Sequence, residues 1–257
     1  MSAPAPLDDA RILWKLAAGR IHGETHAERL ESFYAGQSHG YDRFRAHLLH
    51  GRQELFASID VPQDAVWIDF GAGTGETAEF LRDRLQQLSA LYLVDLCPSL
   101  LAVAEERVNR NAWSNVWVVS ADATSFEPPE LFADVVTFSY SLTMIPDWFV
   151  AIEHAVSLLK PGGVIGVVDF YVSRKYPAAD RRRHGWATRS LWPLWFAFDN
   201  VHLSPDHLPV LESRFEKLAL VEGSGRVPYL PLLRPPYYRF VGRKSPLPES
   251  DPTKSSR

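Results

Sequence analysis

The feature that most constrains the fold is a glycine-rich turn that directly follows a short apolar run. Residues 65–70 (AVWIDF) have the pattern of a buried strand, and Gly71, Gly73 and Gly75 follow it at alternate positions. Glycine allows a tight bend, and its missing Cβ lets a ligand approach the backbone. An amphipathic segment at 76–88 comes next. A strand, a glycine turn and a helix in this order predict an open α/β sheet that binds its ligand at the carboxyl ends of the strands.

The same alternation of apolar runs and helical segments continues to residue 170. The further strands that we expect cover residues 90–94, 116–120, 134–139, 164–170, 215–222 and 237–241, and helices cover 100–109 and 148–159. Nearly continuous apolar strands joined by helices are typical of a parallel sheet that is covered on both faces. We therefore predict an α/β fold with a seven-stranded, mostly parallel sheet and helices on both faces.

Changes in pattern along the chain predict its domain organisation. Apolar residues recur at helical spacing before residue 60, with a glycine-containing break near residues 36–40, so we expect residues 1–60 to form an N-terminal helical cap. Residues 61–242 form the expected binding domain, within which 171–214 are a lid or an acceptor-side insertion. Residues 243–257 are rich in proline, serine and charge, which predicts a flexible tail.

Composition excludes several classes of protein. The net charge of −4 gives no overall attraction for nucleic acid. The single cysteine, Cys97, excludes a disulfide framework and a multi-cysteine zinc site, and histidines such as His39, His50 and His202 lack metal-ligand spacing, so we expect no metal. No apolar run reaches the roughly 20 residues that cross a bilayer, and the N-terminus lacks the pattern of a signal peptide. We expect a cytoplasmic protein.

Two carboxylates at strand ends indicate what the glycine turn binds. Asp95 ends the second strand 24 residues after Gly71, where a carboxylate can hold two ribose hydroxyls. Asp122 ends the third strand, where it can accept a hydrogen bond from an adenine amino group. Each acid alone can also cap a helix or a turn. The dinucleotide fingerprint G-x-G-x-x-G does not fit, because the third glycine comes one residue early and Glu76 takes the sixth position, where it would repel a pyrophosphate.

The pattern D-x-G-x-G-x-G from Asp69 to Gly75, with the turn at residues 158–163 (LLKPGG), resembles the class I methyltransferases. That resemblance implies a Rossmann-like fold and S-adenosyl-L-methionine as the cofactor, with S-adenosyl-L-homocysteine as its product. The residues that it assigns to cofactor binding are Asp69, Gly71, Ala72, Gly73, Gly75, Asp95, Leu96, Asp122, Ala123 and Ser139.

Four further segments resemble the N-methyltransferase part of betaine-lipid (diacylglyceryl-trimethylhomoserine) synthases. They are FYAGQ with YD and LLHGR (33–37, 41–42 and 48–52), SYSLTMIPD (139–147), WFAFDNV (195–201), and RVPY with PPYY (226–229 and 235–238). The resemblance implies that the acceptor is the amino group of a lipid headgroup, diacylglyceryl-homoserine, which receives three methyl groups. It also implies a partner aminocarboxypropyl transferase that makes this substrate. The sequence leaves the oligomeric state open.

Methyl transfer from a sulfonium to an amine requires alignment and desolvation more than a strong base. Tyr140 follows the fourth strand, where related enzymes place acceptor-contacting residues. Tyr41 matches a family tyrosine that closes over the cofactor. We therefore select Tyr41 and Tyr140 as catalytic candidates, with core packing as the alternative for each. Asp147 and Asp199 can anchor an ammonium group or cap a helix or a turn.

An aromatic, basic stretch suggests contact with a membrane surface. Trp186, Trp192, Trp195, Phe196 and Phe198 follow three consecutive arginines at 181–183. Indole rings and arginines together suit a headgroup region, so we expect a peripheral position on the inner face of the membrane. The alternative is that these aromatic side chains form only a lid over the pocket.

Three other functions stay open. A methyltransferase for phosphatidylethanolamine, a quinone precursor or another small molecule would share every cofactor residue. A nicotinamide-dependent oxidoreductase would need a pyrophosphate at the glycine turn. A non-catalytic binding module would retain the fold without turnover.

Overall fold

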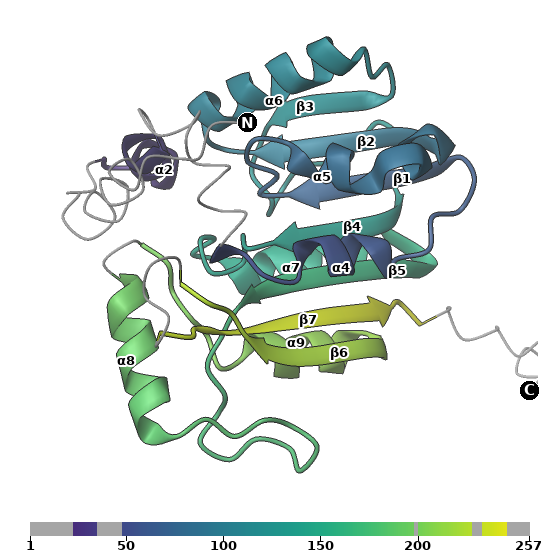
Figure 1. The fold of residues 1–257 in the computed structure, drawn as a ribbon. Helices are drawn as coiled ribbons and strands as arrows, with labels where there is room; N and C mark the ends of the chain where they lie inside the picture. The colour runs from purple at the N-terminus through teal and green to yellow at the C-terminus, as the bar shows by residue number, and fades with distance from the viewer. Residues whose placement is uncertain (1–22, 35–47, 198–199, 228–232, 246–257) are drawn as a thin grey trace, which may run out of the picture.

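The computed structural model describes residues 23–34, 48–197, 200–227 and 233–245 (Figure 1). The elements in these ranges are α2 (His26–Tyr34), α4 (Arg52–Ala57), β1 (Ala65–Phe70), α5 (Glu76–Leu81), the 3₁₀ helix η1 (Arg82–Gln87), β2 (Leu88–Asp95), α6 (Pro98–Asn111), β3 (Val116–Ser120), β4 (Ala133–Ser139), α7 (Trp148–Leu158), β5 (Leu159–Phe170), α8 (Trp186–Ala197), α9 (His207–Arg214), β6 (Glu216–Ser224) and β7 (Pro236–Arg243).

The strands form one seven-stranded sheet in the order β3-β2-β1-β4-β5-β7-β6. β1 to β5 run parallel, and β7 lies antiparallel to both β5 and β6. In Figure 1 the parallel strands point to the left, toward α2 and α8. The predicted α/β class and the mostly parallel sheet are confirmed. The order reverses between β1 and β4, which is where ligands bind in open α/β sheets.

The central strand β1 is buried at every position because helices cover both faces of the sheet. Its side chains alternate between the faces. Trp67 packs in the core cluster that includes α4, α5 and α8, whereas Ile68 and Phe70 pack in the cluster that includes α7 and α9. The indole N–H of Trp67 donates to Thr137 Oγ1 at 2.9 Å, which satisfies its polar group. This hydrogen bond joins the middle of β1 to the neighbouring strand β4.

One local prediction was wrong, and another needs a closer description. The helix predicted over 76–88 ends at Leu81, because Arg82 adopts a positive φ of 52° and a 3₁₀ helix continues to Gln87. The turn predicted at 158–163 lies at the start of β5, where residues 160–163 face the single residue Asp134 of β4 and Gly162 has a positive φ of 81°.

Of the predicted N-terminal cap, the structure describes α2, α4 and a few residues around them. α2 begins with a capping box, in which Glu28 N–H donates to Thr25 Oγ1 and Glu28 Oε2 accepts from Thr25 N–H at 3.1 Å. Leu30 of α2 packs on Cys97 and Leu100 at the start of α6. Of the described cap elements, α2 therefore lies against the carboxyl end of β2, whereas α4 packs against α5 and β5. Across the described residues, no helix has the length and apolar character needed to span a bilayer.

Candidate active site

A cavity opens at the carboxyl ends of the parallel strands. Its walls come from α2, the glycine turn, the ends of β2 and β3, and the loop after β4. The lining residues are His26, Leu30, Gly71, Gly73, Val94, Asp95, Leu96, Leu100, Ala121, Asp122, Ala123, Thr124, Tyr140, Ser141, Met144, Ile145, Pro146 and Asp147. This set contains eight of the residues selected from the sequence: Gly71, Gly73, Asp95, Leu96, Asp122, Ala123, Tyr140 and Asp147.

The glycine turn needs its glycines for conformation and for space. Gly71, Gly73 and Gly75 have positive φ values of 70°, 57° and 74°. A Cβ on Gly71 would lie 2.3 Å from Ser141 Cβ, so a larger residue would displace the loop after β4. The amides of Gly71 and Ala72 both donate to the Val94 carbonyl, at 2.8 and 3.1 Å. Ala72 and Gly75 thus shape the turn, while Gly71 and Gly73 line the cavity.

Asp95 joins the turn to the end of β2. Its Oδ2 accepts a hydrogen bond from Gly73 N–H at 2.8 Å, and its Oδ1 accepts from Cys97 N–H at 2.9 Å. The residue is 9% exposed and faces the cavity. Each carboxylate oxygen has a second acceptor site. Asp95 therefore has the chemistry to accept from two hydroxyl groups of a ligand while it holds the turn in place.

Asp122 lies exposed beyond β3 and also lines the cavity. Its Oδ1 accepts from Thr124 N–H at 2.8 Å and from Thr124 Oγ1 at 2.7 Å, which fixes the carboxylate orientation. Leu96 and Ala123 add apolar surface to the lining of the same cavity. A carboxylate acceptor between apolar surfaces suits the edge of an adenine ring.

Asp69, by contrast, lies beneath the turn rather than on the cavity wall. It is fully buried, with Oδ2 accepting from Thr77 Oγ1 and Oδ1 accepting from Thr137 Oγ1, both at 2.6 Å. Burial raises the pKa of Asp69 to about 6, although the two hydroxyl donors oppose this. Its contacts join α5 to β4, which positions the turn but places no atom of Asp69 in the lining.

Ser139 also lies outside the lining, in a polar contact that the sequence analysis missed. Arg52 of α4 donates from Nε to Ser139 Oγ at 3.0 Å and forms an ion pair with Glu76, both side chains being largely buried. The guanidinium also lies 5.0 Å from the centre of the Phe80 ring. The charge of Glu76 is thus compensated by Arg52, so Glu76 is not an isolated negative charge beside the turn. The signal for Arg52 was an arginine inside an otherwise apolar helical pattern.

The charged residues that line the cavity indicate the charge of the ligand that it favours. Three carboxylates line it, Asp95, Asp122 and Asp147, and none of its described lining residues is a lysine or an arginine. Burial lowers the pKa of His26, the remaining titratable nitrogen in the lining, and so disfavours its charged form. A site of this charge favours a cationic ligand and disfavours a pyrophosphate.

Tyr140 occupies a strained position after β4, with φ 56°. Its N–H donates to the Val168 carbonyl and its hydroxyl donates to the His50 carbonyl, both at 2.7 Å. Its ring packs 4.6 Å from that of Phe170. Burial raises the pKa of Tyr140 well above its usual value. The phenol is therefore a neutral, fixed wall of the cavity and has no capacity to act as a base at neutral pH.

Asp169, which the sequence analysis also missed, supports the loop that carries Tyr140 and Asp147. It is fully buried at the end of β5, where it accepts from Thr143 Oγ1 at 2.7 Å and from Thr143 N–H at 3.1 Å. Burial raises its pKa to about 7. A lone acid inside the apolar run of β5 was the available signal.

The other selected residues are accounted for as follows. Tyr41, Phe198 and Asp199 lie outside the described residues. Asp147 is the N-cap of α7 but makes no side-chain capping bond. His50 accepts from Arg226 N–H at 2.8 Å, which is a structural role. Within the described ranges, no group of three or more His, Cys, Asp or Glu side chains has an arrangement that could hold a metal ion.

Comparison with solved structures defines the class of fold. The chain is similar to the N-methyltransferase NodS from Bradyrhizobium japonicum WM9, solved in complex with S-adenosyl-L-homocysteine, with a TM-score of 0.57, 16% identity, and coverage of 86% of this chain and 99% of that one. It is also similar to phosphoethanolamine N-methyltransferase 2 of Haemonchus contortus, solved with phosphomonomethylethanolamine and S-adenosylhomocysteine, with a TM-score of 0.62, 15% identity, and coverage of 85% and 60%. At these identities the likeness establishes the Rossmann-like methyltransferase fold.

A family model described as a methyltransferase domain matches residues 41–218, more than half of the chain. The chain therefore belongs to the methyltransferase-domain family, as the sequence resemblance implied, and S-adenosyl-L-methionine is the cofactor consistent with this family and fold. A curated relative, the demethylmenaquinone methyltransferase of Geobacillus kaustophilus (strain HTA426), is 25% identical over 147 residues, which is 55% of this chain. The match spans 62% of that relative's length.

Proposed function

We propose that the chain transfers a methyl group from S-adenosyl-L-methionine to the amino group of a lipid headgroup, with diacylglyceryl-homoserine as the first candidate acceptor. The observation that carries the proposal is the single continuous cavity with three carboxylates and, among its described lining residues, no lysine or arginine. One part of this cavity has the groups to hold a nucleoside. The other part has the groups to hold an ammonium.

The cofactor part consists of the glycine turn and the two strand-end carboxylates. Bound S-adenosyl-L-methionine supplies an electrophilic methyl group on a sulfonium. Asp95 would hold the ribose hydroxyls, Asp122 would hold the adenine amino group, and Gly71 and Gly73 would leave room for the methionine part. S-adenosyl-L-methionine fits these residues chemically, because carboxylates accept hydrogen bonds from hydroxyl and amino groups and attract a cation.

The acceptor part consists of Tyr140, Asp147 and apolar residues of the loop between them. The Asp147 carboxylate lines the cavity and makes no capping bond to α7, so it is available to hold an ammonium. The ring of Tyr140 can stabilise the positive charge that accumulates on the methylated nitrogen. Met144 and Ile145 of the loop add half-buried apolar surface to the cavity, which reduces the hydration of the amine and raises its reactivity. Proton release needs no dedicated base, since Asp147 and solvent meet at the cavity.

Resemblance supports an amine acceptor, and the curated relatives supply the competing candidate. The motifs shared with betaine-lipid synthases favour diacylglyceryl-homoserine, made by a separate aminocarboxypropyl transferase. The two solved N-methyltransferases act on nitrogen, as their names say. The demethylmenaquinone methyltransferases favour a quinone precursor instead. A quinone ring carries no ammonium, so Asp147 would have no partner in that reaction.

The test is transfer of labelled methyl from S-adenosyl-L-methionine to vesicles doped separately with diacylglyceryl-homoserine, phosphatidylethanolamine or demethylmenaquinone. We expect label in the homoserine lipid. Label in phosphatidylethanolamine alone would support a lipid amine as the acceptor but would replace diacylglyceryl-homoserine with another headgroup. Label in demethylmenaquinone alone, or in none of the three, would overturn the proposal.

A further inference from the structure

The outward face of α8 carries no charge. The residues of α8 that are exposed to solvent are Trp186, Ala187, Ser190, Leu191, Leu194, Trp195 and Ala197. At 100° per residue they fall on one side of the helix. Trp186 is 81% exposed and Leu194 is 64% exposed. A helix in water normally places polar residues on such a face.

The inward face of α8 fixes this orientation. Trp192 and Phe196 are each 5% exposed, and their rings pack on each other at 5.8 Å. The Phe196 ring lies 4.6 Å from that of Phe170, which in turn lies 4.6 Å from Tyr140. Because the inner face is already bound to the core, α8 cannot bury its outer tryptophans by rolling over. The helix also lies two aromatic contacts from the cavity wall.

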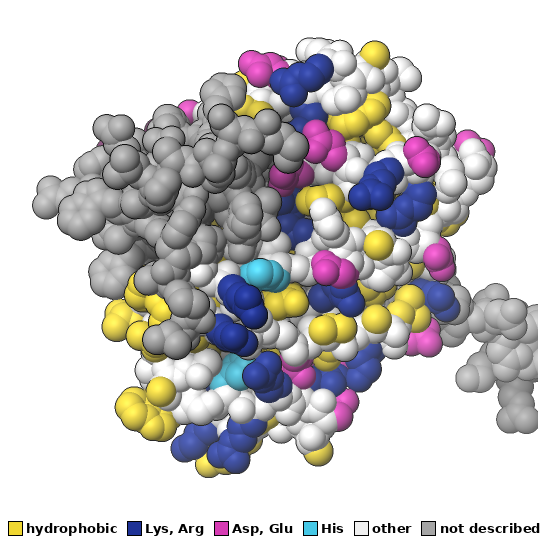
Figure 2. All heavy atoms as spheres, in the orientation of Figure 1, with side chains coloured by type: hydrophobic (Ala, Val, Ile, Leu, Met, Phe, Trp, Pro, Cys, Tyr) yellow, Lys and Arg dark blue, Asp and Glu magenta, His cyan; other side chains and the backbone are white. Residues whose placement is uncertain are grey.

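Cations gather beside the first turn of α8. Ser173 and His184 exchange two hydrogen bonds, from Ser173 N–H to Nδ1 at 3.0 Å and from His184 N–H to Ser173 Oγ at 2.9 Å. This pair brings residues 174–176 next to residues 182–186. Lys175 and Arg183 both lie over the exposed ring of Tyr176, at 5.3 and 5.8 Å from its centre. Figure 2 shows hydrophobic side chains over α8 at the lower left, with Lys and Arg side chains gathered at the bottom.

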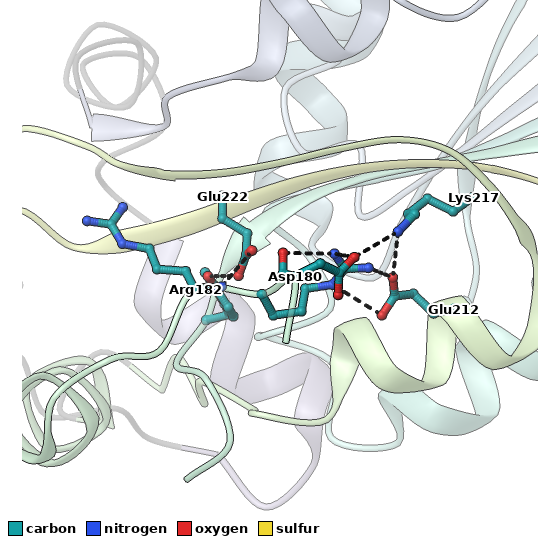
Figure 3. A network of polar contacts seen from close by, with 7 residues as sticks. Asp180, Arg182, Glu212, Lys217 and Glu222 are labelled. Carbon is teal, nitrogen blue, oxygen red and sulfur yellow. Dashed lines mark hydrogen bonds and ion pairs between the residues drawn. The ribbon is translucent and has the colours of Figure 1, made fainter. Parts of the chain in front are cut away.

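The three consecutive arginines have different roles. Arg181 is engaged by Glu212 and Asp180, and Lys217 joins the same ion-pair network (Figure 3). The backbone N–H of Arg182 donates to Glu222 at 2.9 Å, while its guanidinium points away from the network. The network therefore anchors the loop, and Arg182 and Arg183 extend from it with Lys175.

We propose that the outer face of α8, with Lys175, Arg182 and Arg183, docks on an anionic lipid bilayer. Exposed indoles settle at the headgroup level of a membrane, leucines enter the acyl boundary, and adjacent cations meet lipid phosphates. A protein partner would need a matching acidic, apolar surface, whereas an anionic bilayer offers both over any area. The inference deepens the proposed function, because a lipid headgroup must reach the cavity next to Tyr140.

The test is co-sedimentation with phosphatidylcholine vesicles that contain or lack phosphatidylglycerol, measured without S-adenosyl-L-methionine. We compare the full chain with the double variant Trp186→Ser and Trp195→Ser. The matched control is Trp117→Ser, because Trp117 is a half-exposed tryptophan on β3, far from α8. We expect the double variant to lose about tenfold or more of its vesicle partition. The control should keep it, and all proteins should bind S-adenosyl-L-methionine equally.

Charge reversal provides a second arm. Arg182→Glu with Arg183→Glu should remove the preference for phosphatidylglycerol, and added salt should do the same to the unmodified chain. The inference would be overturned if the tryptophan double variant kept its vesicle partition, or if Trp117→Ser lost as much. It would also be overturned if the chain bound no vesicles and formed a dimer that dissociates in the tryptophan double variant. Vesicle binding without methylation of lipid would overturn the proposed function alone. Methylation of dispersed short-chain lipid without vesicle binding would overturn this inference alone.

Discussion

Replacing Arg52 with methionine should destabilise the fold strongly, because it leaves Glu76 buried without its partner. The side chains of Arg52 and Glu76 are 6% and 13% exposed, so solvent screens their interaction little. Removing one member of a buried ion pair costs about 3–5 kcal/mol in the free energy of unfolding. Replacing both, as Arg52→Met with Glu76→Met, removes the stranded charge. The remaining cost is then about 1–2 kcal/mol, mainly from the lost hydrogen bond to Ser139.

Circular dichroism during urea unfolding measures these differences in unfolding free energy. They appear as shifts of the urea midpoint while the dependence of the free energy on urea concentration stays the same. Arg110→Met is the control, since Arg110 lies exposed in the last turn of α6 and its removal should change stability by about 0.5 kcal/mol or less. A cost below about 1 kcal/mol for Arg52→Met, or a double variant whose cost equals the sum of the two single variants, would refute the reasoning.

Three further predictions concern the site. Asp95→Ala should weaken S-adenosyl-L-methionine binding by about 2 kcal/mol, the size of a hydrogen bond to a charged group, and calorimetry that finds unchanged affinity would remove Asp95 from the site. Asp147→Asn should raise KM for the amine acceptor and leave cofactor affinity unchanged. Steady-state kinetics in which only the KM for S-adenosyl-L-methionine changes would contradict the acceptor role. Asp169 has a folded-state pKa of about 7, above its unfolded value, so its contribution favours folding at low pH and is lost as pH rises from about 4 through 7. Asp169→Asn should therefore flatten the fall in stability over this range, with a residual slope from Asp69, and an unchanged profile in urea titrations at several pH values would show that Asp169 does not titrate there.

The sequence predicted those positions at the cavity that are encoded locally. A strand end is visible as the last residue of an apolar run, so the local pattern alone was enough to place Asp95 and Asp122 at one edge of the sheet. The seven strands were predicted for the same reason. Asp69 was assigned to the ligand from its position in the motif. Its contacts with Thr77 and Thr137 come from other elements and were invisible in the local pattern.

The residues that the sequence analysis missed act through contacts distant in the chain. Arg52 meets Ser139 across 87 positions, and no local pattern indicates such a pairing. Glu76 shows the consequence, because an argument from its charge alone ignored the arginine that neutralises it. Asp169 on β5 likewise supports Thr143 in the loop after β4. Long-range polar pairs of this kind depend on tertiary packing, which one sequence does not reveal.

The tryptophan-rich segment shows why composition alone could not separate a lid from a membrane contact. Both interpretations need apolar side chains, and α8 has them on its inner and outer faces alike. The structure divides the group, with Trp192 and Phe196 in the core and Trp186 and Trp195 in solvent. The two interpretations are therefore compatible, since the inner aromatics wall the site through Phe170 while the outer ones remain for a surface. It follows that substitution of the inner pair should damage folding and turnover together, whereas substitution of the outer pair should change only access to acceptors held in a bilayer.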